Sequence, residues 1–189
     1  MKPALLVIDL QRWFFKSPDR QSELRHLVES TNQLIDFFYG EQLPIIHIVT
    51  VHQADGSTGD LWMKRNNSVS LVEGTRDAEE LPEVHRYSGD VTVTKTRHSA
   101  FIRTQLEDVF RRMQVDTVVL AGYSTNACVG LTAIDAYERD FDVLIAAEAT
   151  LGINASRTEA MLQVLRQEYG FEAMPISRIM EEVCSATAR

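Results

Sequence analysis

Three side chains with the capacity for covalent chemistry follow three separate apolar runs of the sequence. Asp9 and Lys95 each end such a run, and Cys128 follows another after a few small residues. Runs of this kind are typical of strands that are buried on both faces of a parallel sheet. Because ligands of open parallel sheets bind beyond the carboxyl ends of the strands, we expect these three residues to lie near one another.

An aspartate, a lysine and a cysteine held together could form a nucleophilic site. Cysteine attacks carbonyl groups as the thiolate, and a helix N-terminus or a neighbouring ammonium group stabilises that anion. Since Cys128 is predicted near the first turn of a helix, we expect a lowered pKa for its thiol. Asp9 could accept the thiol proton and later return it to a leaving group. A buried lysine is costly without a carboxylate partner, so Lys95 is expected to pair with Asp9.

Each of these residues also has a purely structural interpretation. Buried cysteines are common as small apolar filler, and Cys184, in the predicted C-terminal helix, is interpreted in that way. An aspartate after a strand often caps a turn, and a lysine at a strand end is often solvated. The joint placement of all three residues at strand ends favours one site over three unrelated structural roles.

The elements that must position these residues alternate along the chain. Strands are predicted over 4–9, 44–51, 90–95, 116–122, 141–148 and, more weakly, 171–176. Helices are predicted over 22–39, 103–113, 126–139, 156–170 and 177–186. Ser156 and Glu159 are predicted to form a capping box at the start of the fourth helix. The alternation indicates a parallel sheet covered by helices on both faces.

A long segment interrupts this alternation. Residues 53–90 are rich in glycine, asparagine, serine and aspartate and lack sustained periodicity. Loops of this length inside a domain are usually functional or poorly ordered. We therefore expect the segment either to contribute to the site or to be mobile.

Composition limits the class of protein. The 189 residues are 44% hydrophobic, which is suited to one domain spanning 1–189. With a formal net charge of −8, the protein is repelled by nucleic acid and by anionic membranes, so neither is expected as a partner. No apolar run approaches the roughly 20 residues needed to span a bilayer. The two cysteines form no disulfide framework, so we expect a reduced, cytoplasmic protein.

Three segments, in order, resemble those of the isochorismatase-like cysteine hydrolases. LLVIDLQRWF resembles their opening D-x-Q-x-x-F motif, and VTKTRHSAF resembles their K-x-x-x-S-A-F segment. LAGYSTNACVGLTAIDAYERDFDVLIAAEA is similar to their nucleophile segment and the strand after it. The resemblance spans nearly the whole chain and is specific for the superfamily, which includes nicotinamidases and N-carbamoylsarcosine amidases, but much less specific for a substrate.

The resemblance implies a three-layer, Rossmann-like α/β fold with a six-stranded parallel sheet in the order 3-2-1-4-5-6. It also implies a catalytic triad of Asp9, Lys95 and Cys128. A cis peptide bond between Tyr123 and Ser124 is implied too, which would turn the Ser124 N–H toward the same point as the Cys128 N–H. Two such donors make an oxyanion hole. The implied reaction is hydrolysis of a C–N bond in a small amide-like molecule through a thioester.

No cofactor and no catalytic metal are expected. Metal-dependent nicotinamidases of the superfamily carry a D-x-H…H cluster after the second strand, and the matching segment here has His52 and Asp55 without that spacing. True isochorismatases, which cleave a vinyl ether, generally lack the cysteine, so Cys128 favours C–N hydrolysis. Members of the superfamily are commonly dimers or larger oligomers, and the resemblance implies a homo-oligomer.

Six side chains are candidates for contact with the substrate: Gln11, Phe14, Trp62, His98, Phe101 and Tyr123. Phe14 and Phe101 match aromatic residues of the first two motifs, with core packing as the alternative. Tyr123 adjoins the expected oxyanion hole, and Trp62 could close the site from the long segment. His98 either contacts the substrate or is merely exposed.

Other classes of protein compete with this interpretation. A non-catalytic small-molecule-binding member of the fold would not need an intact set of Asp9, Lys95 and Cys128. A thiol redox protein would need a resolving cysteine near the first, and the sequence has no CxxC motif. A dinucleotide-binding protein would need a glycine-rich turn after the first strand, where IDLQRWF has no glycine. Vinyl-ether hydrolysis is the alternative reaction within the superfamily.

Overall fold

A computed structural model describes residues 1–187, so the last two residues of the predicted domain lie outside the described part. Six parallel strands form one sheet in the order β3-β2-β1-β4-β5-β6, which confirms the expected order. The strands are β1 (Pro3–Ile8), β2 (Ile45–Thr50), β3 (Val91–Lys95), β4 (Thr117–Tyr123), β5 (Asp142–Leu151) and β6 (Ala173–Met174).

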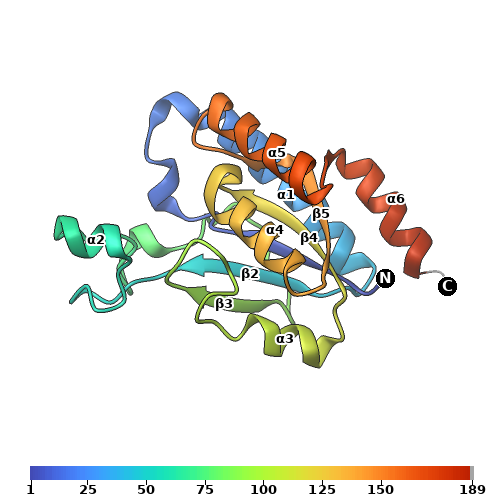
Figure 1. Ribbon diagram of the computed structural model, residues 1–189, viewed down its shortest axis with the longest axis horizontal. Helices are drawn as coiled ribbons and strands as arrows, with labels where there is room; N and C mark the ends of the chain where they lie inside the picture. Colours follow the sequence, from blue (N-terminus) through green and yellow to red (C-terminus); the bar gives the residue numbers. More distant parts are fainter. Residues whose placement is uncertain (188–189) are drawn as a thin grey trace.

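Helices cover both faces of the sheet (Figure 1). They are α1 (Gln21–Gly40), α2 (Leu61–Asn66), α3 (Leu106–Met113), α4 (Gly130–Tyr137), α5 (Ala155–Tyr169) and α6 (Ile176–Thr187). Leu106, Ala133 and Leu165, from α3, α4 and α5, pack in the core on one face. Leu34 of α1 and Ile179 of α6 pack in the core on the other face. The three layers match the predicted fold class.

Strand β1 lies at the centre because both of its faces are apolar. Leu6 and Ile8 belong to one core, while Leu5 and Val7 belong to the other, and all four are fully buried. Burying an aliphatic side chain of this size contributes about 1.5–3 kcal/mol, so the strand is firmly held. The strand ends at Ile8, and the next residue, Asp9, has a φ of 51°, in the left-handed region that is uncommon for a residue with a side chain.

The end of β4 approaches the end of β1 closely. Gly122 has a φ of 118°, and a Cβ atom there would collide with the backbone of Ile8. Only glycine permits this approach. The next peptide bond, Tyr123–Ser124, is cis, as the resemblance implies. The chain then passes through a short π-helical turn over Thr125–Val129 before α4 begins, so the predicted single helix over 126–139 is divided in two.

The predicted capping box of α5 is wrong. The helix begins at Ala155, so Ser156 lies inside its first turn, and Asn154 is the N-cap. The Asn154 side chain accepts a hydrogen bond of 2.9 Å from the Arg157 N–H. Asparagine and serine are similarly good N-caps, which is why the sequence pattern did not separate them. Gly170, with a φ of 76°, ends the helix as predicted.

The segment 53–90 is ordered rather than mobile. It contains α2, which stands beyond the carboxyl ends of β2 and β3 (Figure 1), and a short helical turn at Arg76–Ala78. Its C-terminal part is anchored by four side chains that we call the clasp cluster: His47, Glu80, Arg86 and Asp90. Polar contacts therefore supply the order that apolar periodicity did not predict.

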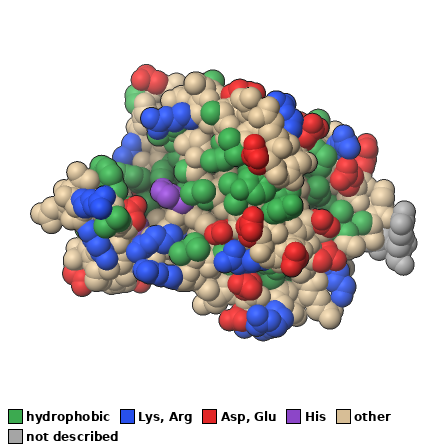
Figure 2. Space-filling model, in the orientation of Figure 1, with side chains coloured by type: hydrophobic (Ala, Val, Ile, Leu, Met, Phe, Trp, Pro, Cys, Tyr) green, Lys and Arg blue, Asp and Glu red, His purple; other side chains and the backbone are tan. Residues whose placement is uncertain are grey.

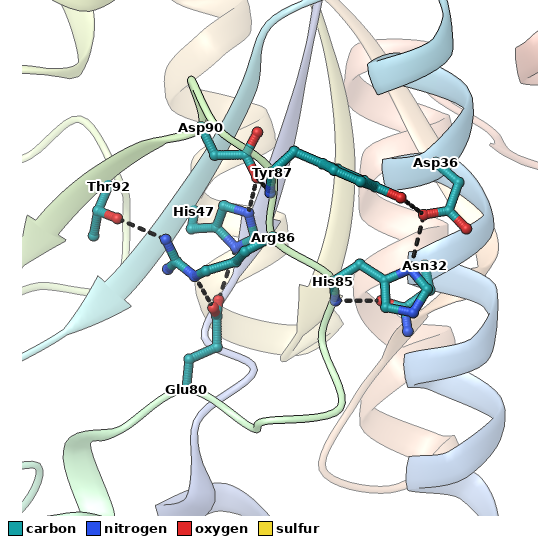
Figure 3. Close-up of polar contacts among 9 residues, drawn as sticks. All are labelled: Asn32, Asp36, His47, Glu80, His85, Arg86, Tyr87, Asp90 and Thr92. Atoms are coloured by element: carbon teal, nitrogen blue, oxygen red, sulfur yellow. Dashed lines mark hydrogen bonds and ion pairs between the residues drawn. The ribbon is translucent and has the colours of Figure 1, made fainter.

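Figure 3 shows how the clasp cluster joins the segment to the sheet. His47 projects from β2, and its Nδ1 lies 2.9 Å from Glu80 Oε1. Its Nε2 lies 3.3 Å from Asp90 Oδ2. Arg86 donates a 2.6 Å hydrogen bond to the second Glu80 oxygen. Both ring nitrogens of the fully buried histidine are thus occupied by protein groups.

The surface carries mixed charge. Figure 2 shows acidic and basic side chains distributed over one face, with hydrophobic side chains gathered over α4. No helix within residues 1–187 combines the length and the apolar character needed to cross a membrane.

Candidate active site

The structure brings Asp9, Lys95 and Cys128 together at the carboxyl edge of the sheet. The Lys95 ammonium donates a 2.7 Å hydrogen bond to Asp9 Oδ2 and lies 3.5 Å from Cys128 Sγ. Asp9 is fully buried, Lys95 is 1% exposed and Cys128 is 7% exposed. The parallel sheet produces this arrangement, because β1, β3 and β4 all end at the same edge.

Thr50 completes the polar network and was missed by the sequence analysis. Its hydroxyl donates a 2.8 Å hydrogen bond to Asp9 Oδ1 and accepts one of 2.7 Å from Lys95 Nζ. Both carboxylate oxygens of Asp9 therefore have a protein donor. A threonine at the end of a β-branched strand gives no distinct signal, since threonine is common in strands. We call Asp9, Thr50, Lys95 and Cys128 the pocket cluster.

The expected lowering of the Cys128 pKa is wrong. Burial and, after it, the negative charge of Asp9 raise the pKa of the thiol to about 12, against the opposing effect of Lys95. The sequence indicated the neighbouring ammonium but not that the thiol is almost fully enclosed. The Cys128 side chain is therefore a neutral thiol at neutral pH, and its deprotonation requires a base.

Lys95 stays charged in this enclosed position. Burial opposes its ammonium form, yet the charge of Asp9 and its hydrogen bond to Lys95 outweigh that effect and raise the pKa of Lys95. Its remaining hydrogen bond, of 3.1 Å, goes to the Arg97 carbonyl. A fixed positive charge thus lies beside both the carboxylate and the sulfur.

The backbone before Cys128 turns tightly around the Ser124 carbonyl. The turn hydrogen bonds here are donated by Ala127 and Val129, both to the Ser124 carbonyl. Within residues 1–187, the Ser124 N–H donates no turn or loop hydrogen bond to another backbone group. The Ser124 N–H is one of the two donors expected to form the oxyanion hole, and it is available to a ligand.

A pocket of about 270 Å³ opens onto the pocket cluster. Its apolar wall includes Trp13, Phe14 and Tyr123, with the rings of Phe14 and Tyr123 centred 5.2 Å apart. Leu71 and Met63 from the 53–90 segment line another part. The volume is suited to a small organic molecule, and Cys128 is among the lining residues.

Comparison with known proteins identifies the family. The family model described as the isochorismatase domain matches residues 3–174. The chain belongs to the isochorismatase family.

Similar proteins of this isochorismatase-family chain include amidases. Nicotinamidase 3 of Arabidopsis thaliana is 30% identical over 170 residues, which cover 89% of this chain and 81% of the relative. Maleamate amidohydrolase of Pseudomonas putida is 28% identical over 173 residues, with the same coverage of both chains. The crystal structure of an isochorismatase family protein from Desulfovibrio vulgaris has a TM-score of 0.85 and 27% identity, covering 100% of this chain and 99% of that one.

Three of the predicted substrate contacts line the pocket of this isochorismatase-family protein, namely Phe14, His98 and Tyr123. His98 is exposed, and its Nδ1 lies 3.6 Å from Cys128 Sγ. Trp13 and Arg97 line the pocket as well and were missed. Both residues lie inside the segments that resemble the family motifs, at positions where the motifs allow any residue. Counting these variable positions as candidates would have included Trp13 and Arg97.

The other three predicted contacts lie outside the pocket lining. Gln11 is fully buried, and its side-chain amide is bonded to the backbone N–H and carbonyl of Thr50 and to the Ala78 carbonyl. It anchors the 53–90 segment instead of facing a ligand. Phe101 packs in the core against Phe110, with ring centroids 5.8 Å apart. Trp62 is 65% exposed on α2.

The described residues of this isochorismatase-family site offer no set of ligands for a metal ion. Within residues 1–187, no three histidine, cysteine, aspartate or glutamate side chains converge in a way that could hold a metal ion. His52 lines the pocket, and burial lowers its pKa. The positive charges of Arg97 and Lys95 act in the same direction, whereas the negative charge of Asp60 opposes them. The residues present do not fit a catalytic metal.

Proposed function

We propose that this protein is a cysteine amidohydrolase that cleaves the C–N bond of a small amide through a thioester at Cys128. The observation that carries the proposal is the position of the Cys128 thiol, enclosed beside the Asp9–Lys95 pair at the base of a pocket. The nicotinamidase and the maleamate amidohydrolase among its relatives support a C–N bond as the target.

The first step is attack by sulfur on the amide carbonyl. At pH 7 a thiol with a pKa of about 12 is ionised in roughly one molecule in 10⁵, so the proton must leave during attack. Asp9 is the acceptor, since its carboxylate is close enough to raise the pKa of the thiol and shares Lys95 with the sulfur. Lys95 stabilises the negative charge that shifts from carboxylate to sulfur. The carbonyl oxygen is received by the Ser124 and Cys128 N–H groups.

The C–N bond then breaks, and Asp9 gives its proton to the leaving nitrogen. The released molecule is ammonia or an amine, and the acyl group stays on sulfur as a thioester. Water hydrolyses the thioester to a carboxylic acid and restores the thiol.

The pocket favours a small substrate with a flat apolar part. Trp13, Phe14 and Tyr123 offer aromatic surface, while Arg97 and Asp60 supply charged groups elsewhere in the lining. We therefore propose a compact amide, cyclic or aromatic, with one polar substituent.

The test is an assay of ammonia and amine release with a panel of small amides that includes nicotinamide and maleamate. Cys128→Ala should abolish release of the amine while circular dichroism and thermal unfolding show an intact fold. Cys184→Ala is the matched control, because that cysteine is exposed and far from the pocket in sequence, and it should hydrolyse the amide at the wild-type rate.

Two results would contradict the proposal. One is amide hydrolysis by Cys128→Ala at the rate of the wild type. The other is hydrolysis of isochorismate, included in the panel, without hydrolysis of any amide; this would favour vinyl-ether cleavage instead.

A further inference from the structure

Cys128 has a second basic neighbour besides Asp9. His98 Nδ1 lies 3.6 Å from Cys128 Sγ, and this is its one polar contact within residues 1–187. The two neighbours differ in environment, because Asp9 is fully buried whereas His98 is exposed and lines the pocket. The nucleophile thus lies between a base enclosed by protein and a base in contact with solvent.

The position of His98 is set by the residue before it. The Arg97 carbonyl accepts the 3.1 Å hydrogen bond from Lys95, and the Arg97 guanidinium donates one of 2.9 Å to the Thr58 carbonyl. These contacts attach the 96–98 backbone to the pocket cluster on one side and to the 53–90 segment on the other. The position of the backbone therefore holds the imidazole near the sulfur. Within residues 1–187, the His98 ring has no other hydrogen-bond partner.

Asp9 is poorly placed for the second half of the reaction. Its Oδ1 accepts from Thr50 and its Oδ2 from Lys95, and none of its surface reaches solvent. Once an acyl group is attached to sulfur, that group fills the space between Asp9 and the open pocket. The hydrolytic water must arrive from the pocket side, where His98 lies.

We propose that His98 is the general base that activates water for hydrolysis of the Cys128 thioester, while Asp9 serves the acylation step. The inference rests on the proposed cysteine amidohydrolase function. The water oxygen bonds to the thioester carbon as one water proton moves to the imidazole. The C–S bond then breaks, its electron pair stays on sulfur, and the imidazolium returns the proton to sulfur. The products are the carboxylic acid and the free thiol, so atoms and charge balance.

The 3.6 Å between His98 Nδ1 and Cys128 Sγ is consistent with both proton transfers, from water to the imidazole and from the imidazolium to sulfur. A water about 3 Å from the imidazole nitrogen and from the thioester carbon can also lie close to sulfur, because a carbon bonded to sulfur is within 2 Å of it. The same nitrogen faces sulfur at 3.6 Å for return of the proton. Imidazole both accepts and releases protons near neutral pH, which suits it to a base that must act and then be reset.

The experiment separates acylation from deacylation with p-nitrophenyl acetate as the probe. Nitrophenolate release reports acetylation of the thiol, and intact-protein mass spectrometry reports the acetyl group on the enzyme. His98→Asn keeps a polar group near the position of Nδ1, and His98→Gln keeps the length of the ring. Because His98 is exposed, both variants should fold, which thermal unfolding will verify.

In both variants we expect a burst of about one nitrophenolate per enzyme, followed by slow turnover. Loss of a general base lowers deacetylation roughly 10²-fold, so the acetyl-enzyme should accumulate. Hydroxylamine, a stronger nucleophile than water, should restore release of the acetyl group. His85→Asn is the matched control, since His85 is also exposed but contacts Asp36, and it should show wild-type kinetics.

Deacetylation at the wild-type rate in both His98 variants would overturn the inference. So would a parallel fall of the burst rate and the steady-state rate without accumulation of acetyl-enzyme. Failure of the proposed function looks different: either the wild type would not be acetylated at all, or Cys128→Ala would retain the burst.

Discussion

Two polar clusters lie on this sheet, the clasp cluster around the buried His47 and the buried pocket cluster, and they differ in whether any group remains free to meet a ligand. In the clasp cluster both ring nitrogens of His47 face carboxylates, and Arg86 satisfies the remaining Glu80 oxygen. In the pocket cluster Lys95 and Thr50 satisfy Asp9, but the Cys128 sulfur still faces a pocket. Buried polar groups whose partners are all protein groups hold a structure together, whereas an enclosed nucleophile with open access can react.

The placement of the clusters explains the difference. His47 projects from within β2, where the 80–90 chain covers it. Asp9 and Lys95 lie at the ends of strands, and Cys128 follows one, so no strand continues over them. Burial of charge by itself therefore does not mark a catalytic site in this protein; burial at the carboxyl edge of the sheet does.

Asp9→Asn should have the largest effect in this comparison. The variant keeps the shape of the side chain but loses the proton acceptor, so amide hydrolysis should fall roughly 10²–10⁴-fold. It also leaves the Lys95 charge buried without its partner, which should lower the free energy of unfolding by about 3–5 kcal/mol. Steady-state kinetics and urea unfolding measure the two effects. Activity within a few-fold of wild type would remove Asp9 from the mechanism.

The stability loss in Asp9→Asn has a defined pH range. The folded-state pKa of Lys95 is raised above its ordinary value of 10.5, so the pair contributes fully below that value. Its contribution is lost only as the pH rises through the raised pKa. The contribution of the Asp9–Lys95 pair to the unfolding free energy of the wild type should therefore be constant between about pH 7 and 9.

Alkylation of Cys128 by iodoacetamide should reveal its raised pKa. Because only the thiolate reacts, the rate should rise about tenfold per pH unit from pH 7 to 10, roughly 10³-fold in all. An ordinary cysteine would level off near its pKa of about 8.5. Peptide mass spectrometry can follow Cys128 and the exposed Cys184 in the same sample, so Cys184 serves as the internal reference. A plateau for Cys128 below pH 9 would show an activated resting thiolate instead.

Thr50→Val should have a smaller effect on activity. The substitution keeps the shape but removes the hydroxyl that bridges Asp9 and Lys95. Leaving these two groups short of one partner should cost about 1–3 kcal/mol of stability and lower kcat roughly tenfold. Thr50→Ser restores the hydroxyl and should restore kcat. Equal losses in the valine and serine variants would indicate packing rather than hydrogen bonding.

His47→Gln should change stability alone. Loss of the ring removes one contact from each of Glu80 and Asp90, which should lower the free energy of unfolding by about 1–3 kcal/mol. The kcat of the folded variant should stay within about twofold, because distant sites act nearly independently. A large fall in kcat would show that the clasp cluster is coupled to the pocket cluster, and the backbone pairing of Gln11 with Glu80 is the connection to examine.

Much of the fold and the centre of the site followed from local patterns. The apolar runs before Asp9 and Lys95 predicted buried strands, and the rule for parallel sheets placed their ends together. The N-cap of α5 was misplaced by two residues, since Asn154 and Ser156 are chemically similar caps. The order within 53–90 was not predictable, because it depends on contacts such as that of His47 with Glu80, 33 residues apart.

The sequence by itself determined which residue types stand at the strand ends, and with them the family motifs and the candidate triad. Only the tertiary structure decided that Cys128 is enclosed enough to have a raised pKa, and that Thr50 bridges Asp9 and Lys95. It also decided which motif aromatics face the pocket, with Phe14 lining it and Phe101 in the core. The physical reason is that strand identity is set by neighbours along the chain, whereas desolvation and hydrogen-bond partnership are set by groups that only folding brings together.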